Sequence, residues 1–198
     1  GDAAVIHVFK DGSELSVTSP VNGSFTVGES GTNTKLDLMV ESAGTVWYVD
    51  CDKEASGNGT SWDDAFRSIQ KAVAASLPGN EIWVKRGTYY PSTMISLDWP
   101  IGIYGGFDGT ETLKEQRDWH NNITIVDGQN TVRCFHVTAD AIIDGFTITH
   151  GHPPVGGGGG MDVQMASPTV RNCIFSENEA NWGGGMWNYR SDSNVTNC

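Results

Sequence analysis

Hydrophobic and polar residues alternate in short runs along much of the chain, and glycine, asparagine or aspartate separates most of the runs. In residues 1–44 the runs are AVIHVF, ELSVTS, SFTV and KLDLMVE, with turn residues such as Pro20-Val21-Asn22-Gly23 between them. Alternation with a period of two, interrupted by turns, is typical of short antiparallel strands. We therefore expect residues 1–44 to form a small β-segment, which buries little by itself.

A single stretch has helical spacing. The pattern predicts an α-helix near residues 61–76, in which Ser61 is the N-cap and Leu77-Pro78-Gly79 ends the helix. The apolar residues that recur at helical intervals are Phe66, Ile69 and Val73. A doubly wound α/β domain would need more helices between strands, so one amphipathic helix favours an end cap on a β structure.

A repeat of 25 residues is the strongest feature of the sequence. GGGMDVQMASPTVRNC at 158–173 returns as GGGMWNYRSDSNVTNC at 183–198. A fixed period of this length is typical of a solenoid whose coils stack through parallel strands. Equivalent residues then become neighbours in an internal ladder, which pairs Met161 with Met186, Val170 with Val195, and Cys173 with Cys198.

The order of several further motifs extends this pattern from Thr45 to Cys198. WYVD, SWDDAFRSIQKAV, EIWVKRGTYYP, IYGGFDGTET, NNITIVDG and IDGFTIT precede the glycine-rich repeats. This order resembles that of secreted bacterial right-handed parallel β-helix proteins of the pectate-lyase-like superfamily. The resemblance implies an all-β fold for residues 45–198, a right-handed parallel β-helix with an N-terminal capping helix near 61–76.

The resemblance implies no single activity, because such domains include lyases, hydrolases, adhesins and structural surface proteins. The sequence lacks the NTD, GHG and RIK motifs by which the pectin hydrolases resemble one another, and His150-Gly151-His152 is only a superficial echo. The calcium-binding carboxylate cluster of pectate lyases is also missing from the repeats. These departures favour a non-catalytic module.

The charge balance narrows the choice of partners. The formal net charge is −12, which opposes binding to nucleic acid and to anionic membrane surfaces. No run approaches the roughly 18 apolar residues that a membrane span requires. We expect a secreted or cell-surface protein whose partners are itself, another surface protein or a neutral glycan.

Three aromatic residues in the last repeat are candidate binding residues: Trp182, Trp187 and Tyr189. If Met186 lies in the internal ladder, strand alternation turns Trp187 and Tyr189 outward. Outward aromatic rings stack on sugar rings, pack on another protein chain, or simply cover the surface. The sequence leaves all three alternatives open.

Several acidic and histidine residues are weaker candidates. Asp50, Asp52 and Glu54 offer oxygen ligands for calcium, although they lack the spacing of an EF-hand, and a solvated loop is the alternative. Calcium is the only cofactor that the residues suggest. His150 and His152 would need a third ligand from the fold to hold a metal.

Asp127 and Asp144 each precede glycine, which suits either acid–base chemistry on a glycosidic bond or an ordinary turn. Cys173 and Cys198 are either stacked core thiols or a disulfide between adjacent coils. The remaining cysteines, Cys51 and Cys134, form no CxxC motif.

Two functions follow from these observations. The first is an extracellular, non-catalytic β-helix module for cell-surface assembly, adhesion or filament formation. The alternative is a polysaccharide lyase or glycoside hydrolase with its active site in coils beyond residue 198. The sequence ends within a repeat, so we expect that further coils or another molecule cover the strand edges there.

Overall fold

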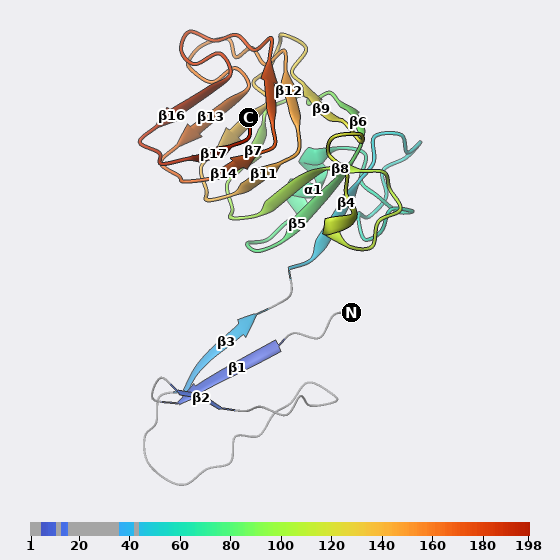
Figure 1. Ribbon diagram of the computed structural model, residues 1–198, viewed down its shortest axis with the longest axis vertical. Helices are drawn as coiled ribbons and strands as arrows, with labels where there is room; N and C mark the ends of the chain where they lie inside the picture. The colour runs from blue at the N-terminus through green and yellow to red at the C-terminus, as the bar shows by residue number, and fades with distance from the viewer. Residues whose placement is uncertain (1–4, 11–12, 16–35, 42–43) are drawn as a thin grey trace. The chain divides into compact units, whose positions relative to one another are not determined.

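Short strands dominate the computed structural model, which describes residues 5–10, 13–15, 36–41 and 44–198. The chain divides into two units, Gly1–Gly44 and Thr45–Cys198. The first unit contains a three-stranded antiparallel sheet with the order β2-β1-β3 (Figure 1). Its strands are β1 (Val5–Lys10), β2 (Ser13–Leu15) and β3 (Leu36–Glu41). The expected strand SFTV lies outside the described residues.

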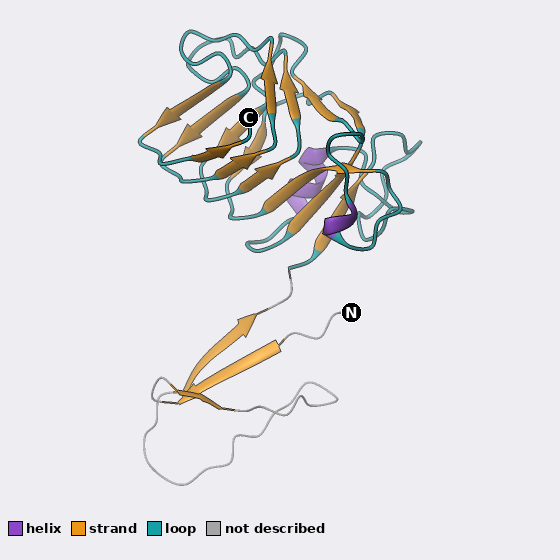
Figure 2. Cartoon of the chain, viewed as in Figure 1, coloured by secondary structure: helices purple, strands orange, loops and turns teal. Residues whose placement is uncertain are grey.

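The second unit consists of three parallel sheets, which we call sheets I, II and III. Sheet I has the order β17-β14-β11-β8-β5-β4, sheet II the order β16-β13-β10-β7, and sheet III the order β15-β12-β9-β6. From β5 onward the chain passes repeatedly from sheet I to sheet III, then to sheet II and back to sheet I (Figure 2). The all-β prediction is confirmed, and the stacked coils make a solenoid-like structure.

The strands of this unit are short. Sheet I contains β4 (Val46–Val49), β5 (Glu81–Lys85), β8 (Gly102–Phe107), β11 (Ile142–Asp144), β14 (Thr169–Arg171) and β17 (Asn194–Thr196). Sheet II contains β7 (Ile95–Leu97), β10 (Phe135–Val137), β13 (Met161–Gln164) and β16 (Met186–Tyr189). Sheet III contains β6 (Gly87–Tyr89), β9 (Thr124–Asp127), β12 (Thr147–Thr149) and β15 (Ile174–Ser176).

The strand register stacks equivalent residues of successive coils. Met161 pairs with Met186 in sheet II, and Val170 pairs with Val195 in sheet I. Met161 and Val170 are fully buried, whereas 46% of Val195 is exposed on the last coil. Inward-facing side chains of all three sheets meet in one hydrophobic core, because alternate residues of each strand point into the solenoid.

The helix α1 (Ile69–Ala75) begins later than the sequence pattern predicts. Its N-cap is Ser68, whose side-chain oxygen accepts a hydrogen bond from the Lys71 amide. Phe66 is not helical, because its backbone forms a parallel bridge with Val49. Ser61 instead closes a local turn by accepting a hydrogen bond from the Asp64 amide. The expected span 61–76 therefore shortens to its second half.

The glycine triplets allow the chain to turn and adjacent coils to approach. Gly158 and Gly183 have positive φ angles of 66° and 55°, which glycine adopts without steric cost. A Cβ atom on Gly160 would lie 2.6 Å from the carbonyl oxygen of Gly185 in the next coil. Each glycine-rich corner is therefore needed for stacking. In the described part of the chain, no helix has the length and apolar character to cross a membrane.

Candidate functional site

The three candidate aromatic residues lie together at one end of sheet II, and we call Trp182, Trp187 and Tyr189 the aromatic row. The ring centroids of Trp182 and Trp187 are 5.9 Å apart, and those of Trp187 and Tyr189 are also 5.9 Å apart. Trp182 is 61% exposed and Tyr189 is 41% exposed. The row therefore presents adjacent aromatic faces to solvent.

Strand pairing explains how the row is held. On β16, Trp187 pairs with Asp162 of β13 and Tyr189 pairs with Gln164. The Trp187 indole lies against Gly157, where a Cβ atom would approach it to 2.3 Å. The Arg190 guanidinium lies 5.2 Å from the centroid of the Tyr189 ring, within the range of a cation–π contact.

A buried carboxylate lies beside the aromatic row. Asp162 is 2% exposed, and its Oδ2 atom lies 3.2 Å from His136 Nδ1 and accepts a hydrogen bond of 3.0 Å from Gln164 Nε2. The Arg133 guanidinium is 3.5 Å from the same oxygen. The other oxygen, Oδ1, is buried without a hydrogen-bond partner. Buried polar atoms of this kind are rare in native proteins and often mark a functional position.

No motif in the sequence points to the residues around Asp162. Asp162 appears in the sequence only as the position equivalent to Trp187, and nothing in the 25-residue repeat singles it out. The signal that finds this group is the parallel register, which pairs His136 of β10 with Asp162 of β13. Once that register is known, His136 and Asp162 are expected to be neighbours on the same face of sheet II.

The proposed calcium ligands contact a lysine. Lys85 Nζ lies 3.1 Å from Asp50 Oδ2 and 3.2 Å from Asp52 Oδ2. Glu54 uses its backbone oxygen to accept a hydrogen bond from Arg67. Among the described residues, no group of three or more His, Cys, Asp or Glu side chains has the arrangement of a metal site. Lys85 therefore supplies the positive charge between the two aspartates.

His150 lies between two carboxylates from neighbouring coils. Its Nδ1 atom is 3.2 Å from Asp127 Oδ1, and its Nε2 atom is 2.7 Å from Glu177 Oε2. His152 takes no part in this group. The arrangement links the end of β9 to the turns after β12 and β15. Asp127 therefore pairs with a histidine, whereas Asp144 pairs with arginines in a different cluster.

Asp144 is the centre of a buried ionic cluster. Its carboxylate is fully buried and accepts hydrogen bonds from Arg117 at 2.5 Å, Arg171 at 2.7 Å and Asn172 at 2.8 Å. Burial alone would raise the pKa of Asp144, but the hydrogen bonds from Arg117, Asn172 and Arg171 hold the pKa below its usual value. A carboxylate with these partners stabilises the corner between sheets I and III.

All four cysteines are free thiols in the structure. Cys173 is buried and Cys198 is exposed, and the two thiols interact with each other. That contact raises the pKa of Cys173 and lowers the pKa of Cys198 to about 6, and burial raises the pKa of Cys134 to about 12. Burial also raises the pKa of Cys51.

These environments predict an order of thiol reactivity, since the thiolate is the nucleophile. In the reduced protein at pH 7, an aromatic disulfide reagent should modify Cys198 first and Cys51 more slowly. Cys134 should react only after denaturation, whereas Cys173 should react in the native protein only by displacing the reagent from the mixed disulfide on Cys198. Absorbance of the released thiol gives the rates, and peptide mass mapping assigns them; rapid modification of native Cys134 would contradict the packing.

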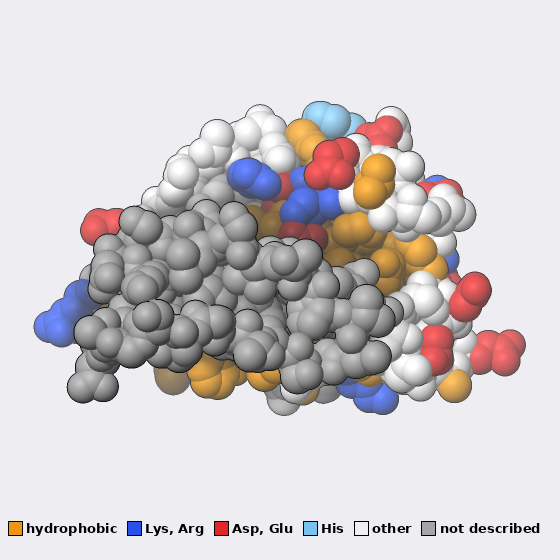
Figure 3. Space-filling model, turned by 90° about the horizontal axis from the view of Figure 1, so that it is seen from below, with side chains coloured by type: hydrophobic (Ala, Val, Ile, Leu, Met, Phe, Trp, Pro, Cys, Tyr) orange, Lys and Arg blue, Asp and Glu red, His pale blue; other side chains and the backbone are white. Residues whose placement is uncertain are grey.

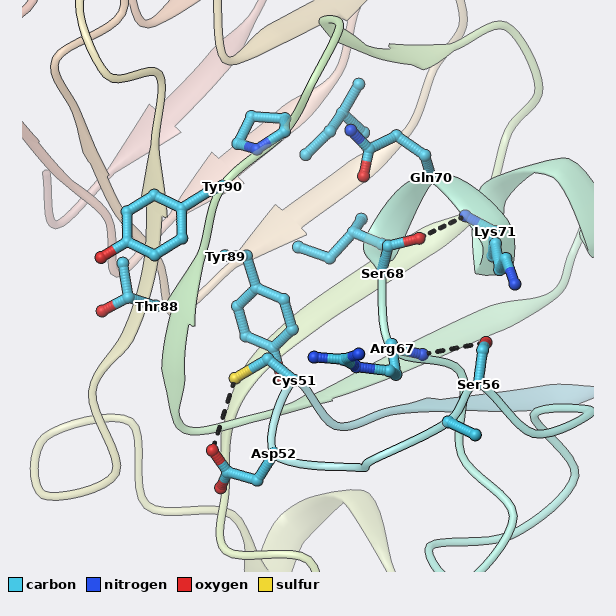
Figure 4. A pocket seen from close by; sticks show the side chains of 14 residues that line it. Cys51, Asp52, Ser56, Arg67, Ser68, Gln70, Lys71, Thr88, Tyr89 and Tyr90 are labelled. Atoms are coloured by element: carbon cyan, nitrogen blue, oxygen red, sulfur yellow. Dashed lines mark hydrogen bonds between the residues drawn. The ribbon is translucent and has the colours of Figure 1, made fainter.

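A cavity of about 680 Å³ lies between the loop after β4, the start of α1 and the segment that follows β6. In Figure 4 the Arg67 guanidinium extends toward Cys51 and the Tyr89 ring, whereas the Lys71 side chain points away from them. Tyr89 is almost fully buried, and its hydroxyl donates to the Lys85 carbonyl oxygen at 2.9 Å. No motif in the sequence points to this cavity.

A second hollow of about 400 Å³ follows the corner between sheets I and III. Its walls include Trp119, His120 and Ile174, and Cys173 and Cys198 also line it. Elsewhere the surface is mixed: Figure 3 shows charged side chains of both signs beside hydrophobic ones on the face that it draws.

Comparison with protein-family models, with curated proteins and with solved structures finds no match to this chain. The site must therefore be interpreted from its own geometry.

Proposed function

We propose that this chain is a non-catalytic, extracellular adhesion module that binds a neutral polysaccharide along the outward face of sheet II. In this proposal the fold is a right-handed β-helix of the pectate-lyase-like superfamily, and the protein is secreted or held at the cell surface. The observation that carries the proposal is the aromatic row, in which the rings of Trp187 and Tyr189 on β16 and of Trp182 just before it form two contacts in sequence.

The chemistry of the neighbouring residues supports a sugar ligand. Aromatic faces pack on the apolar faces of sugar rings, while polar groups beside them hydrogen-bond the hydroxyl groups. Gln164 lies next to Tyr189 across the strand pair, and Asp162 and His136 lie in register with Trp187 on the two preceding strands. The net charge of −12 favours a neutral chain over an acidic one.

Replacing Trp187 with alanine should weaken polysaccharide binding roughly 10-fold, because a central aromatic contact of this kind contributes about 1–2 kcal/mol. The measurement is affinity electrophoresis of the 198-residue chain in gels that contain a soluble β-glucan, xylan or mannan. Trp99→Ala is the matched control, since Trp99 is exposed but lies outside the aromatic row.

Three results would contradict the proposal. If the polysaccharide gel retards Trp187→Ala and the parent chain equally, the aromatic row does not bind the polysaccharide. Release of new reducing ends or unsaturated products from the polysaccharides would favour an enzyme. The third result is that no glycan slows migration, while light scattering shows a particle size that grows with protein concentration. If Trp187→Ala abolishes this growth, the partner of the aromatic row is a second copy of the chain.

A further inference from the structure

The cavity beside α1 carries a positive charge that the rest of its lining does not neutralise. Arg67 donates one hydrogen bond, of 3.2 Å, to the backbone oxygen of Glu54. Within residues 44–198, no carboxylate forms an ion pair with Arg67. A guanidinium has five N–H donors, so most of its donors remain available to a ligand.

The one acidic residue in the lining does not cancel this charge. Asp52 already forms an ion pair with Lys85 at 3.2 Å. Lys71 also belongs to the lining, and its ammonium adds to the positive potential although its side chain points away from Tyr89 (Figure 4). In a protein of net charge −12, the cavity is therefore a local site of attraction for an anion.

The other residues that line the cavity are suited to bind a ring-shaped part of a ligand. Ile69, Ile95 and Pro91 are buried and form apolar lining, and Tyr89 adds an aromatic ring to the wall toward which the Arg67 guanidinium extends (Figure 4). Tyr90 is 60% exposed, so its ring is free to stack on a ligand. The volume of about 680 Å³ is within the usual range for small-molecule sites.

We propose that this cavity binds a small carboxylate whose body is a six-membered ring, with the carboxylate on Arg67 and the ring against Tyr90 and Pro91. Arg67 matches a carboxylate because its planar fork presents two parallel donors. This site is separate from the aromatic row and does not depend on the proposed polysaccharide binding. Sugar acids and aromatic acids share the chemistry, and the test distinguishes them.

The probes are glucuronate and 4-hydroxybenzoate, with glucose and 4-hydroxybenzyl alcohol as their uncharged counterparts. Isothermal titration calorimetry on the 198-residue chain measures all four at low ionic strength. We expect saturable binding of at least one acid and none of its uncharged counterpart. Arg67→Met should weaken the binding roughly 10- to 100-fold, because a charge-assisted hydrogen bond is lost. Tyr90→Ala should weaken it several-fold.

Arg86→Met is the matched control, because Arg86 is an exposed arginine that pairs with Asp108 outside the cavity. It should bind the acid as the parent does, and so should Trp187→Ala. Unchanged urea denaturation of Arg67→Met shows that the fold is intact. The proposal is overturned if neither acid binds, if the uncharged counterpart binds equally well, or if Arg67→Met binds as tightly as Arg86→Met.

Discussion

Replacement of Asp144 with asparagine should lower the free energy of unfolding by about 3 kcal/mol, because one partner of a buried ion pair is removed while the other remains. The substitution keeps the shape of the side chain but leaves Arg117, which is 11% exposed, without its negative partner. Arg171 donates to the same carboxylate oxygen as Arg117, and Asn172 donates to the other, so asparagine keeps an acceptor for only one of these two positions. Urea denaturation followed by circular dichroism measures the difference.

Asp63→Asn is the control for this substitution. Asp63 is exposed, and surface changes away from special contacts usually alter stability by less than about 0.5 kcal/mol. An Asp144→Asn chain as stable as the Asp63→Asn chain would show that the cluster does not stabilise the fold.

The contribution of Asp144 should also depend on pH in one direction. Its pKa is lower in the folded protein than in the unfolded chain, where an aspartate has a pKa of about 3.9. The stabilisation is therefore fully present above about pH 5 and is lost as the pH falls through the folded pKa. The stability gap between the parent chain and Asp144→Asn should therefore narrow as the pH falls below the unfolded value of about 3.9. A gap that widens in acid would contradict this assignment.

Gly160→Ala should destabilise the chain by about 3 kcal/mol, at the upper end of the usual cost of overpacking. The added methyl group would lie 2.6 Å from the Gly185 carbonyl oxygen and 2.9 Å from Asn178 Nδ2. Because a backbone oxygen of the next coil is the nearest atom, the coils must separate to admit it. The midpoint of urea denaturation reports the loss.

Gly185→Ala provides an internal control at the equivalent position of the next repeat. Neither glycine has a positive φ angle, and the atom nearest to a Cβ atom on Gly185 would be Phe175 Cβ, at 3.5 Å. In the 198-residue chain its alanine variant should lie within about 0.5 kcal/mol of the parent. Equal losses of stability in Gly160→Ala and Gly185→Ala would contradict this explanation. They would indicate that the backbone conformation of glycine, and not the close approach of coils, determines the cost.

The repeat was sufficient to predict the stacking of equivalent residues, because a constant period brings the same position of each coil to the same edge of a sheet. Met161 and Met186 illustrate this, since their pairing follows from sequence spacing alone. The start of α1 did not follow in the same way. Phe66 fits a helical pattern, but hydrogen bonds with Tyr48 and Asp50 hold its backbone beside β4. Tertiary pairing therefore overrode a local pattern.

The polar sites were harder to predict for a related reason. Asp162 and His136 differ in residue type and come from coils without a shared motif, so only the strand register brings them together. Arg67 is a candidate binding residue because no carboxylate within residues 44–198 forms an ion pair with it. A local sequence pattern does not show whether an arginine has such a partner. Asp50 and Asp52 suggested calcium by their density, yet Lys85 from the adjacent strand β5 lies between them.

The corners of the solenoid differ from its strands in how much added chain they accept. Between β4 and β5 the chain makes an excursion that contains α1, and between β8 and β9 it makes another that contains Trp119 and His120, yet β5 and β8 keep parallel partners on both sides. Insertions at corners therefore leave the ladder of main-chain hydrogen bonds intact. Such a scaffold can acquire new recognition loops by evolution, or by grafting of a foreign peptide, one corner at a time and without redesign of its interior.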